Sequence, residues 1–290
     1  MIALATSHGF CRGYQTSGYS VSATVIGGSG GGMQRDYASH SVRHEEDLDD
    51  PEMIGRLAAE LTLRRLDPGR LASGPMPVVF DPRVGGSLIG HLLSAITGSA
   101  ITRKTSFLLD QEGELVFAPG VTIRDNPHLR RGVRSKPFDG EGVATAPSDI
   151  IAAGRLTGWL LDSASARQLG RAPTGHASRG IGGSPGASVT NLDLLPGTMS
   201  PGNLVSDIKQ GLYVTELIGQ GVNPVTGDYS RGASGFLIAN GEIAGPVAEI
   251  TIAGNLAQMF AQLTPANDLE HRRAVNVPTL RVEGMTVAGA

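Results

Sequence analysis

Glycine and proline interrupt this sequence so often that they limit the length of any helix or strand. The 41 glycines and 17 prolines make up 20% of the 290 residues, a share typical of chains rich in turns and below the range of disordered low-complexity sequence. Hydrophobic residues contribute 40% and charged residues 18%, which is enough for a buried core. We therefore expect a folded chain of short elements, long enough for about two domains.

The charge balance argues against a nucleic-acid partner. The chain carries 24 basic and 27 acidic residues, a net charge of -3, and only 4% aromatic residues. Such a surface has no evident attraction for phosphate backbones and few rings on which bases stack. We expect no direct contact with nucleic acid.

The compartment is predicted from the single cysteine and from the hydropathy pattern. Cys11 stands alone, so neither an intrachain disulfide nor a cysteine-based zinc cluster can form. No apolar run approaches the roughly 20 residues of a membrane helix, and the start of the chain lacks a signal-peptide pattern. We predict a cytoplasmic protein without membrane contact.

The first part of the chain predicts a hairpin and one helix. Residues 18–25 alternate polar and apolar side chains, a glycine run follows, and 33–37 returns as a strand. Asp50 as N-cap and Pro51 at the first helical position open a helix over 52–66. These elements are few for a domain. We therefore expect residues 1–72 to be the remnant of an N-terminal α/β domain whose first elements lie upstream.

The second part is richer in strands. Residues 78–80 form a short buried strand, Pro82 opens a helix through 98, and Asn240-Gly241 predicts a tight hairpin. The further strands are expected at 121–124, 155–162, 188–195, 212–218, 233–239 and 247–252, and the short helices near 163–169, 203–210 and 255–263. The predicted fold class is α+β, with a β-rich C-terminal domain over 73–290 that carries a few helices.

Two short serine motifs have weak support. Ser29 and Ser184 both lie in G-x-S-x-G patterns, but neither is set between a buried strand and a helix, as a nucleophile elbow requires. Both are better interpreted as turns. No phosphate-binding glycine loop that leads into a helix is present, which argues against a nucleotide site.

His40 and His44 are the one pair of histidines with a metal-ligand spacing. Four residues apart, they would share one face of a helix, but residues 39–47 have no apolar face to hold such a helix against a core. An exposed, solvated segment is the favoured interpretation.

The most informative stretch covers 214–236. A strand leads into residues 227–235, where glycines flank charged and aromatic side chains, and a second strand follows. The glycines allow a peptide backbone to approach, and the strands offer edges for β-augmentation. From composition alone, a tight loop with Asp228 paired to Arg231 is slightly favoured over a binding loop.

The same stretch carries a family resemblance. TELIGQGVNPVTGDYSRGASGFLIANGEIAGPVAEITIAGN (215–255) closely resembles the C-terminal domain of the TldD/PmbA family, in its PmbA or TldE branch, historically described as modulators of DNA gyrase. Further matching segments are 90–110, 126–145, 156–170, 173–178 and NDLEHRR at 267–273. The resemblance runs from about residue 9 to the end and lacks the family's first α/β portion.

The resemblance implies a peptidase complex. TldD-type and PmbA-type subunits pair into a heterodimer that degrades or trims peptides in the bacterial cytosol, and the TldD-type subunit binds zinc through an H-E-x-x-x-H helix and a later cysteine. Here the two histidine positions fall on Gly90 and Ala95, the glutamate position on His91, and the cysteine position near Val277. Because these ligands are missing, we expect no metal, cofactor or catalytic residue in this chain.

The expected function is that of a PmbA/TldE-like subunit that contributes substrate binding and assembly to a metallopeptidase complex. Its expected partners are a TldD-type subunit and a peptide substrate, and the chain alone is a candidate for self-association. The candidate peptide-binding residues are Asp228, Tyr229, Ser230, Arg231 and Gly232. Two alternatives remain open: an independent hydrolase that uses Ser184 with His176, and an interaction protein that acts on a gyrase-related partner.

Overall fold

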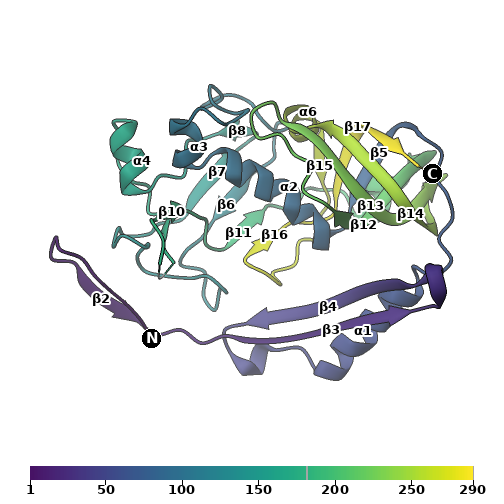
Figure 1. Ribbon diagram of the computed structural model, residues 1–290, viewed down its shortest axis with the longest axis horizontal. Coiled ribbons are helices and arrows are strands. Elements are labelled where there is room, and N and C mark those ends of the chain that lie inside the picture. Colours follow the sequence, from purple (N-terminus) through teal and green to yellow (C-terminus); the bar gives the residue numbers. More distant parts are fainter. Residues whose placement is uncertain (181, 290) are drawn as a thin grey trace.

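The computed structural model describes residues 1–180 and 182–289. Its N-terminal part consists of two antiparallel hairpins and a helix (Figure 1). β1 (Ile2–Ala5) pairs with β2 (Cys11–Tyr14), and β3 (Tyr19–Gly27) pairs with β4 (Gln34–Val42). Single 3₁₀ turns cover Gly30–Gly32 and Glu45–Asp47, and α1 spans Pro51–Leu63. We call β3, β4 and α1 the hairpin unit.

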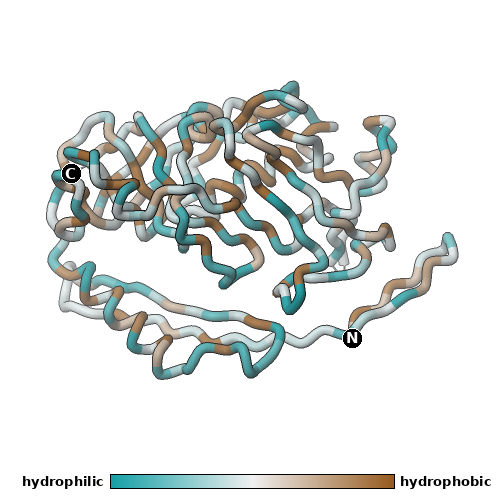
Figure 2. Tube along the Cα trace, turned by 180° about the vertical axis from the view of Figure 1, so that it is seen from behind, coloured by the Kyte–Doolittle hydropathy of each residue, from teal (hydrophilic) through white to brown (hydrophobic). Residues whose placement is uncertain are grey.

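α1 begins where the sequence predicts. The Asp50 side chain accepts a hydrogen bond from the Glu52 backbone N–H at 2.7 Å, and Pro51 occupies the first turn, which satisfies a backbone donor that a helix start leaves free. Hydrophobic and hydrophilic residues alternate along this helix (Figure 2). Its apolar face, with Ile54 and Ala58, packs on the inward side chains of the hairpin and forms a small core of its own.

The largest sheet closes on itself. Its strands are β5 (Gly74–Phe80), β12 (Gln210–Ile218), β13 (Asp228–Ala239), β14 (Glu242–Asn255), β15 (Leu263–Pro265) and β17 (Leu280–Ala288). The order is β14-β13-β12-β5-β17-β15, and β14 also pairs with β17. Five strands therefore form a ring, which leaves few free edges.

A second sheet lies on the other side of helix α2 (Pro82–Ala95) from this ring (Figure 1). It contains β6 (Ile123–Asp125), β7 (Ser148–Ala152), β8 (Arg155–Leu156), β11 (Leu192–Leu194) and β16 (Val275–Asn276) in the order β16-β11-β6-β7-β8, and a separate two-stranded sheet joins β9 (Ala177–Ser178) to β10 (Gly186–Ala187). α2 runs between the second sheet and the ring (Figure 1). Its buried Leu88 and Leu92 belong to one core that includes residues of both sheets.

The remaining helices are short. They are α3 (Gly98–Thr102), α4 (Ser163–Gln168), α5 (Pro201–Val205) and α6 (Leu256–Ala261). None of the described helices has the length and apolarity needed to cross a membrane. The predicted α+β class and the strand-rich C-terminal region are confirmed.

Several predicted elements differ from the observed ones. Residues 155–162 form only the two-residue β8 followed by loop, and 188–195 contain the three-residue β11. The helix expected through 98 ends at Ala95, with α3 starting separately, and the helix expected at 203–210 ends at Val205. The Asn240-Gly241 hairpin is confirmed, with positive φ of 51° and 83° at the two turn residues.

Candidate functional site

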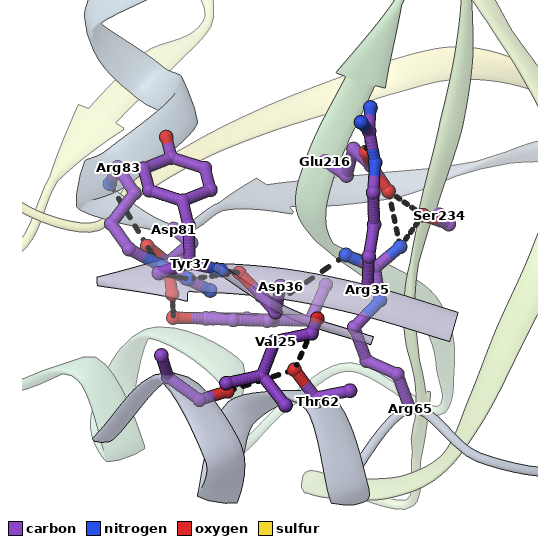
Figure 3. A network of polar contacts seen from close by, with 12 residues as sticks. Val25, Arg35, Asp36, Tyr37, Thr62, Arg65, Asp81, Arg83, Glu216 and Ser234 are labelled. Atoms are coloured by element: carbon purple, nitrogen blue, oxygen red, sulfur yellow. Dashed lines mark hydrogen bonds and ion pairs between the residues drawn. The ribbon is translucent and has the colours of Figure 1, made fainter. Parts of the chain in front are cut away.

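A network of buried charges joins the hairpin unit to the rest of the molecule (Figure 3). Asp36 on β4, only 4% exposed, accepts hydrogen bonds from Arg83 Nη1 at 2.8 Å and Arg65 Nη1 at 3.5 Å. Arg65 also pairs with Glu216 of β12 and donates to Ser234 Oγ of β13 at 2.6 Å. Every buried charge here has a partner, so the network fixes the position of the hairpin unit.

A cleft of about 410 Å³ opens beside this network. Tyr37 and Leu61 line it from the hairpin unit, and Arg273 and Val277 from the C-terminal region. Asp81 lines the cleft and accepts a hydrogen bond at its Oδ2 from the Tyr213 hydroxyl at 3.3 Å. Burial, with the charge of Asp81, raises the pKa of that phenol. The charged groups of this cleft are engaged within the protein, as when Arg273 donates to the Arg83 carbonyl at 2.9 Å.

A second set of buried polar groups lies between α2 and β13. The rings of His91 on α2 and Tyr229 on β13 meet edge to face, with centroids 5.9 Å apart and planes at 77°. Arg231 lies two residues beyond Tyr229 on the same face of the strand. Tyr229 is 2% exposed and Arg231 is 8% exposed. We call these three residues the His91–Tyr229–Arg231 cluster.

The cluster is distinguished by what its polar atoms lack. His91 Nε2, Tyr229 Oη and Arg231 Nε are buried, and within residues 1–180 and 182–289 none has a hydrogen-bond partner in the protein. Burial raises the pKa of Tyr229 to about 12, and the charge and hydrogen-bonding capacity of the neighbouring Arg231 guanidinium oppose this rise. Burial, and then the charge of Arg231, lowers the pKa of His91. At neutral pH the cluster therefore holds one positive charge beside two neutral polar groups.

The predicted peptide-binding loop is a strand. Residues 228–235 belong to β13, which pairs with β12 on one side and β14 on the other, so the expectations of a loop and of a free edge there were wrong. Asp228 and Ser230 are exposed, whereas Tyr229 and Arg231 are buried. Asp228 accepts from Thr226 Oγ1 at 2.6 Å and from Asn255 Nδ2 at 3.3 Å; the predicted pairing with Arg231 is absent from the ion pairs of the described residues. Hydrogen bonds from Thr226, and then Asn255, lower the pKa of Asp228.

The positions that resemble metal ligands do not form a metal site. Gly90, His91 and Ala95 lie along α2, while Val277 packs beside Gly85, where an added Cβ would come within 3.1 Å of the valine Cγ2. Only His91 has a side chain that can ligate zinc. Among the residues that the structure describes, no three His, Cys, Asp or Glu side chains come together in a metal-binding group. The residues present do not fit a metal ion of the family type.

The interpretation of 39–47 as an exposed segment is confirmed for residues 44–47 and wrong for His40. His40 lies on β4, its side chain is 12% exposed, and its Nδ1 is 3.3 Å from Asp49 Oδ2. His44 is the cap residue before the second 3₁₀ turn. The two histidines therefore do not share a helix face.

The serine candidates also remain without a catalytic geometry. The His176 ring is buried, with Nδ1 2.9 Å from Thr174 Oγ1 and Nε2 3.4 Å from Asp125 Oδ2. Ser184 is exposed in the connection between β9 and β10, and no hydrogen bond joins it to His176 within the described residues. Ser29 lies in the turn between β3 and β4. Neither serine follows a strand and opens a helix of the nucleophile-elbow type.

Comparison with known proteins decides the family. The family model for the PmbA/TldA metallopeptidase C-terminal domain matches residues 73–289, and that for the central domain matches residues 1–66. The chain belongs to the PmbA/TldD family. The predicted resemblance is therefore confirmed. Metalloprotease PmbA of Escherichia coli O157:H7 is 44% identical over 284 residues, which is 98% of this chain and 61% of that protein.

Other relatives agree. The metalloprotease PmbA homolog of Haemophilus influenzae is 41% identical over 98% of this chain and 61% of its own length. A crystal structure from Bacteroides thetaiotaomicron, named as a candidate modulator of DNA gyrase, superposes with a TM-score of 0.89 at 31% identity and covers 98% of this chain and 63% of that one. The fold of TldE from Thermococcus kodakarensis is also similar, with a TM-score of 0.86 at 24% identity over 98% of this chain and 65% of that one. The chain spans about three fifths of the length of the curated relatives it matches.

Sequence reasoning missed the role of His91 as a neighbour of Tyr229 and Arg231. A polar histidine on an otherwise apolar helix face is visible in the sequence, as is the Asp-Tyr-Ser-Arg run. Their contact comes from the packing of α2 against β13. It brings the rings of His91 and Tyr229, which are 138 positions apart in the chain, to a centroid distance of 5.9 Å. No local pattern reports that contact.

Proposed function

We propose that this chain is a PmbA/TldE-type subunit of a TldD/TldE-type metallopeptidase complex that degrades or trims peptides in the cytoplasm. In this proposal it contributes substrate binding and assembly, and it holds no metal of its own. The single observation that supports this role is the replacement of ligating side chains by Gly90, Ala95 and Val277 in a chain that retains the family's fold.

The requirements of zinc hydrolysis indicate which groups each subunit of the proposed complex would contribute. Hydrolysis of a peptide by a zinc-bound water needs several nitrogen, oxygen or sulfur ligands and a general base. In the proposed complex these groups come from a TldD-type partner, and this chain supplies a wall that holds the substrate extended. Of the five predicted residues, we propose Tyr229 and Arg231 as substrate-facing, because their side chains share the face of β13 that meets α2. Asp228 and Ser230 lie on the opposite face of the strand.

Metal content and peptide cleavage test the proposal together. We expect the purified chain to contain no stoichiometric transition metal and to cleave no peptide, and its mixture with a TldD-type subunit to cleave peptides in a chelator-sensitive manner. The TldD-type subunit alone is the matched control and is expected to be less active than the mixture.

Two outcomes would overturn it. One tightly held zinc ion per chain would contradict the non-metal role. Chelator-resistant hydrolysis by this chain alone, lost in Ser184→Ala, would favour the independent hydrolase instead.

A further inference from the structure

We propose that the His91–Tyr229–Arg231 cluster is a binding site for a carboxylate group of a bound peptide. This assignment deepens the proposed function, because it names the chemical group that the substrate-binding subunit recognises. It rests on three buried polar groups that converge between α2 and β13 and on the charge they leave uncompensated.

Within the described part of the chain, Arg231 lacks the carboxylate partners that another buried arginine, Arg65, has. Arg65 is 5% exposed and pairs with Asp36 and Glu216. Arg231 is 8% exposed, yet within residues 1–180 and 182–289 no carboxylate lies within ion-pair distance of it, and its Nε has no acceptor. A buried cation without a counter-charge is strongly destabilising. An anion that binds at Arg231 would remove that penalty.

The other two residues supply matching donors. The Tyr229 hydroxyl donates one hydrogen bond, a neutral His91 donates from Nε2 in one of its tautomers, and the Arg231 guanidinium presents a planar fork. A carboxylate accepts at both oxygens and donates nothing, so it satisfies all three groups at once. Ser87, one helical turn before His91 on α2, has a further buried hydroxyl without a partner.

The charge of the cluster favours a carboxylate over a phosphate. Arg231 contributes one positive charge, and the low pKa of His91 keeps that ring neutral at pH 7. One negative charge is therefore neutralised, whereas a phosphate carrying nearly two would remain partly uncompensated.

The backbone around the cluster is already paired. The backbone of 229–231 is paired on one side with β14 and on the other with the segment that contains Gly221 and Val222, so a peptide cannot add as a strand here. Gly90 precedes His91, and an added Cβ at that position would meet no atom within 4 Å. The helix surface is therefore open next to His91.

Binding of defined peptides to the isolated chain tests the assignment. The probes are a dansyl-labelled octapeptide without acidic side chains that ends in a free carboxylate, the same peptide with a C-terminal amide, and the amide peptide with one internal glutamate. We expect at least one carboxylate-bearing probe to bind about tenfold to hundredfold more tightly than the neutral amide, as one charge-assisted bidentate interaction allows. Which of the two binds more tightly identifies a terminal or a side-chain carboxylate.

Substitutions test whether the cluster causes the discrimination between the carboxylate and amide probes. Arg231→Met should reduce the affinity for the carboxylate probe to that of the amide, and Tyr229→Phe should reduce it several-fold, while affinity for the amide stays unchanged. The controls are Arg167→Met and Tyr19→Phe, which alter exposed side chains elsewhere and should bind as the wild type does. If Arg231→Met fails to fold by circular dichroism, Tyr229→Phe and the probe comparison on wild-type protein still decide.

Equal affinity of the wild type for all three probes, or no detectable binding, would overturn the carboxylate site. Loss of discrimination in Arg167→Met rather than in Arg231→Met would do the same. These measurements need neither a partner subunit nor cleavage. A chain that discriminates carboxylates but never supports hydrolysis would retain this site and lose the proposed peptidase role.

Discussion

Tyr229 is fully buried and Tyr213 is partly buried, but within the part of the chain that the structure describes only Tyr213 has a partner for its hydroxyl. Tyr213 donates to Asp81 at 3.3 Å, whereas Tyr229 Oη has no acceptor among the described protein groups. A buried polar group without a hydrogen bond costs about 1–3 kcal/mol. At the residue scale, a group that lowers stability in the free protein is a candidate for function.

We predict that Tyr229→Phe raises the free energy of unfolding by about 1 kcal/mol, because it removes a desolvated hydroxyl without removing a hydrogen bond. Tyr213→Phe is the matched control and should lower the free energy of unfolding by about 1 kcal/mol. Urea denaturation of the three proteins measures both changes. A destabilised Tyr229→Phe variant would mean that this hydroxyl has an acceptor in the folded protein.

His91 gives the stability a pH dependence of known sign. Its pKa is lowered from 6.5 in the folded chain by burial and by Arg231. As pH falls below about 6.5, the unfolded chain binds a proton that the native state resists, so stability decreases until the lowered pKa is reached. His91→Gln should therefore lose less stability than the wild type between pH 7.5 and pH 5, as urea denaturation at each pH would show. Identical losses in both proteins would contradict a perturbed His91.

At the scale of the element, α2 contains glycines with opposite surroundings. An added Cβ at Gly90 would meet nothing within 4 Å, whereas one at Gly85 would lie 3.1 Å from Leu280 Cδ1 and from Val277 Cγ2. Alanine in a helix interior is favoured over glycine by about 0.5–1 kcal/mol. We predict that Gly90→Ala raises the free energy of unfolding by about 0.5–1 kcal/mol, as measured by urea denaturation. Gly85→Ala should raise the free energy of unfolding by less than Gly90→Ala does, or lower it. An equal increase in both variants would show that Leu280 and Val277 move aside without cost.

The same scale shows which elements the sequence predicts. α1 follows from Asp50 and Pro51, and the β13–β14 turn from Asn240-Gly241, because these signals act between neighbours in the chain. The part of β13 at 228–232 was missed because the glycines of 227–235 suggested a loop. There, Gly232 pairs with Ile218, and an added Cβ would lie 3.3 Å from the isoleucine Cβ. The glycine serves strand pairing, and that requirement comes from a distant segment.

The sequence likewise predicted only those features of the candidate site that do not depend on contacts between distant segments. The absence of ligating side chains at Gly90, Ala95 and Val277 can be read from the sequence once the family is recognised. The alternation of β13, which buries Tyr229 and Arg231 and exposes Asp228 and Ser230, follows only when the segment is known to be a strand. The contact of Tyr229 with His91 depends on how α2 packs in the closed core.

At the scale of the whole molecule, the hairpin unit depends on charges for its attachment. Its own apolar core is small and separate from the main core. Asp36 is the carboxylate shared by Arg65 and Arg83, which approach it from different elements. A buried, fully paired charge network fixes orientation well, but it becomes costly when one member is removed.

We therefore predict that Asp36→Asn lowers the free energy of unfolding by about 3 kcal/mol, at the low end for a broken buried ion pair, because Arg65 retains Glu216 and Arg83 retains Asp81. Arg56→Gln, which breaks only an exposed pair with Glu52, should change it by less than about 0.5 kcal/mol. Urea denaturation measures both variants. Limited proteolysis between α1 and β5 should cut Asp36→Asn faster, since β4 would lose its ion pairs with Arg65 and Arg83. Equal stability and equal cleavage in the two variants would show that apolar packing, rather than this network, holds the hairpin unit in place.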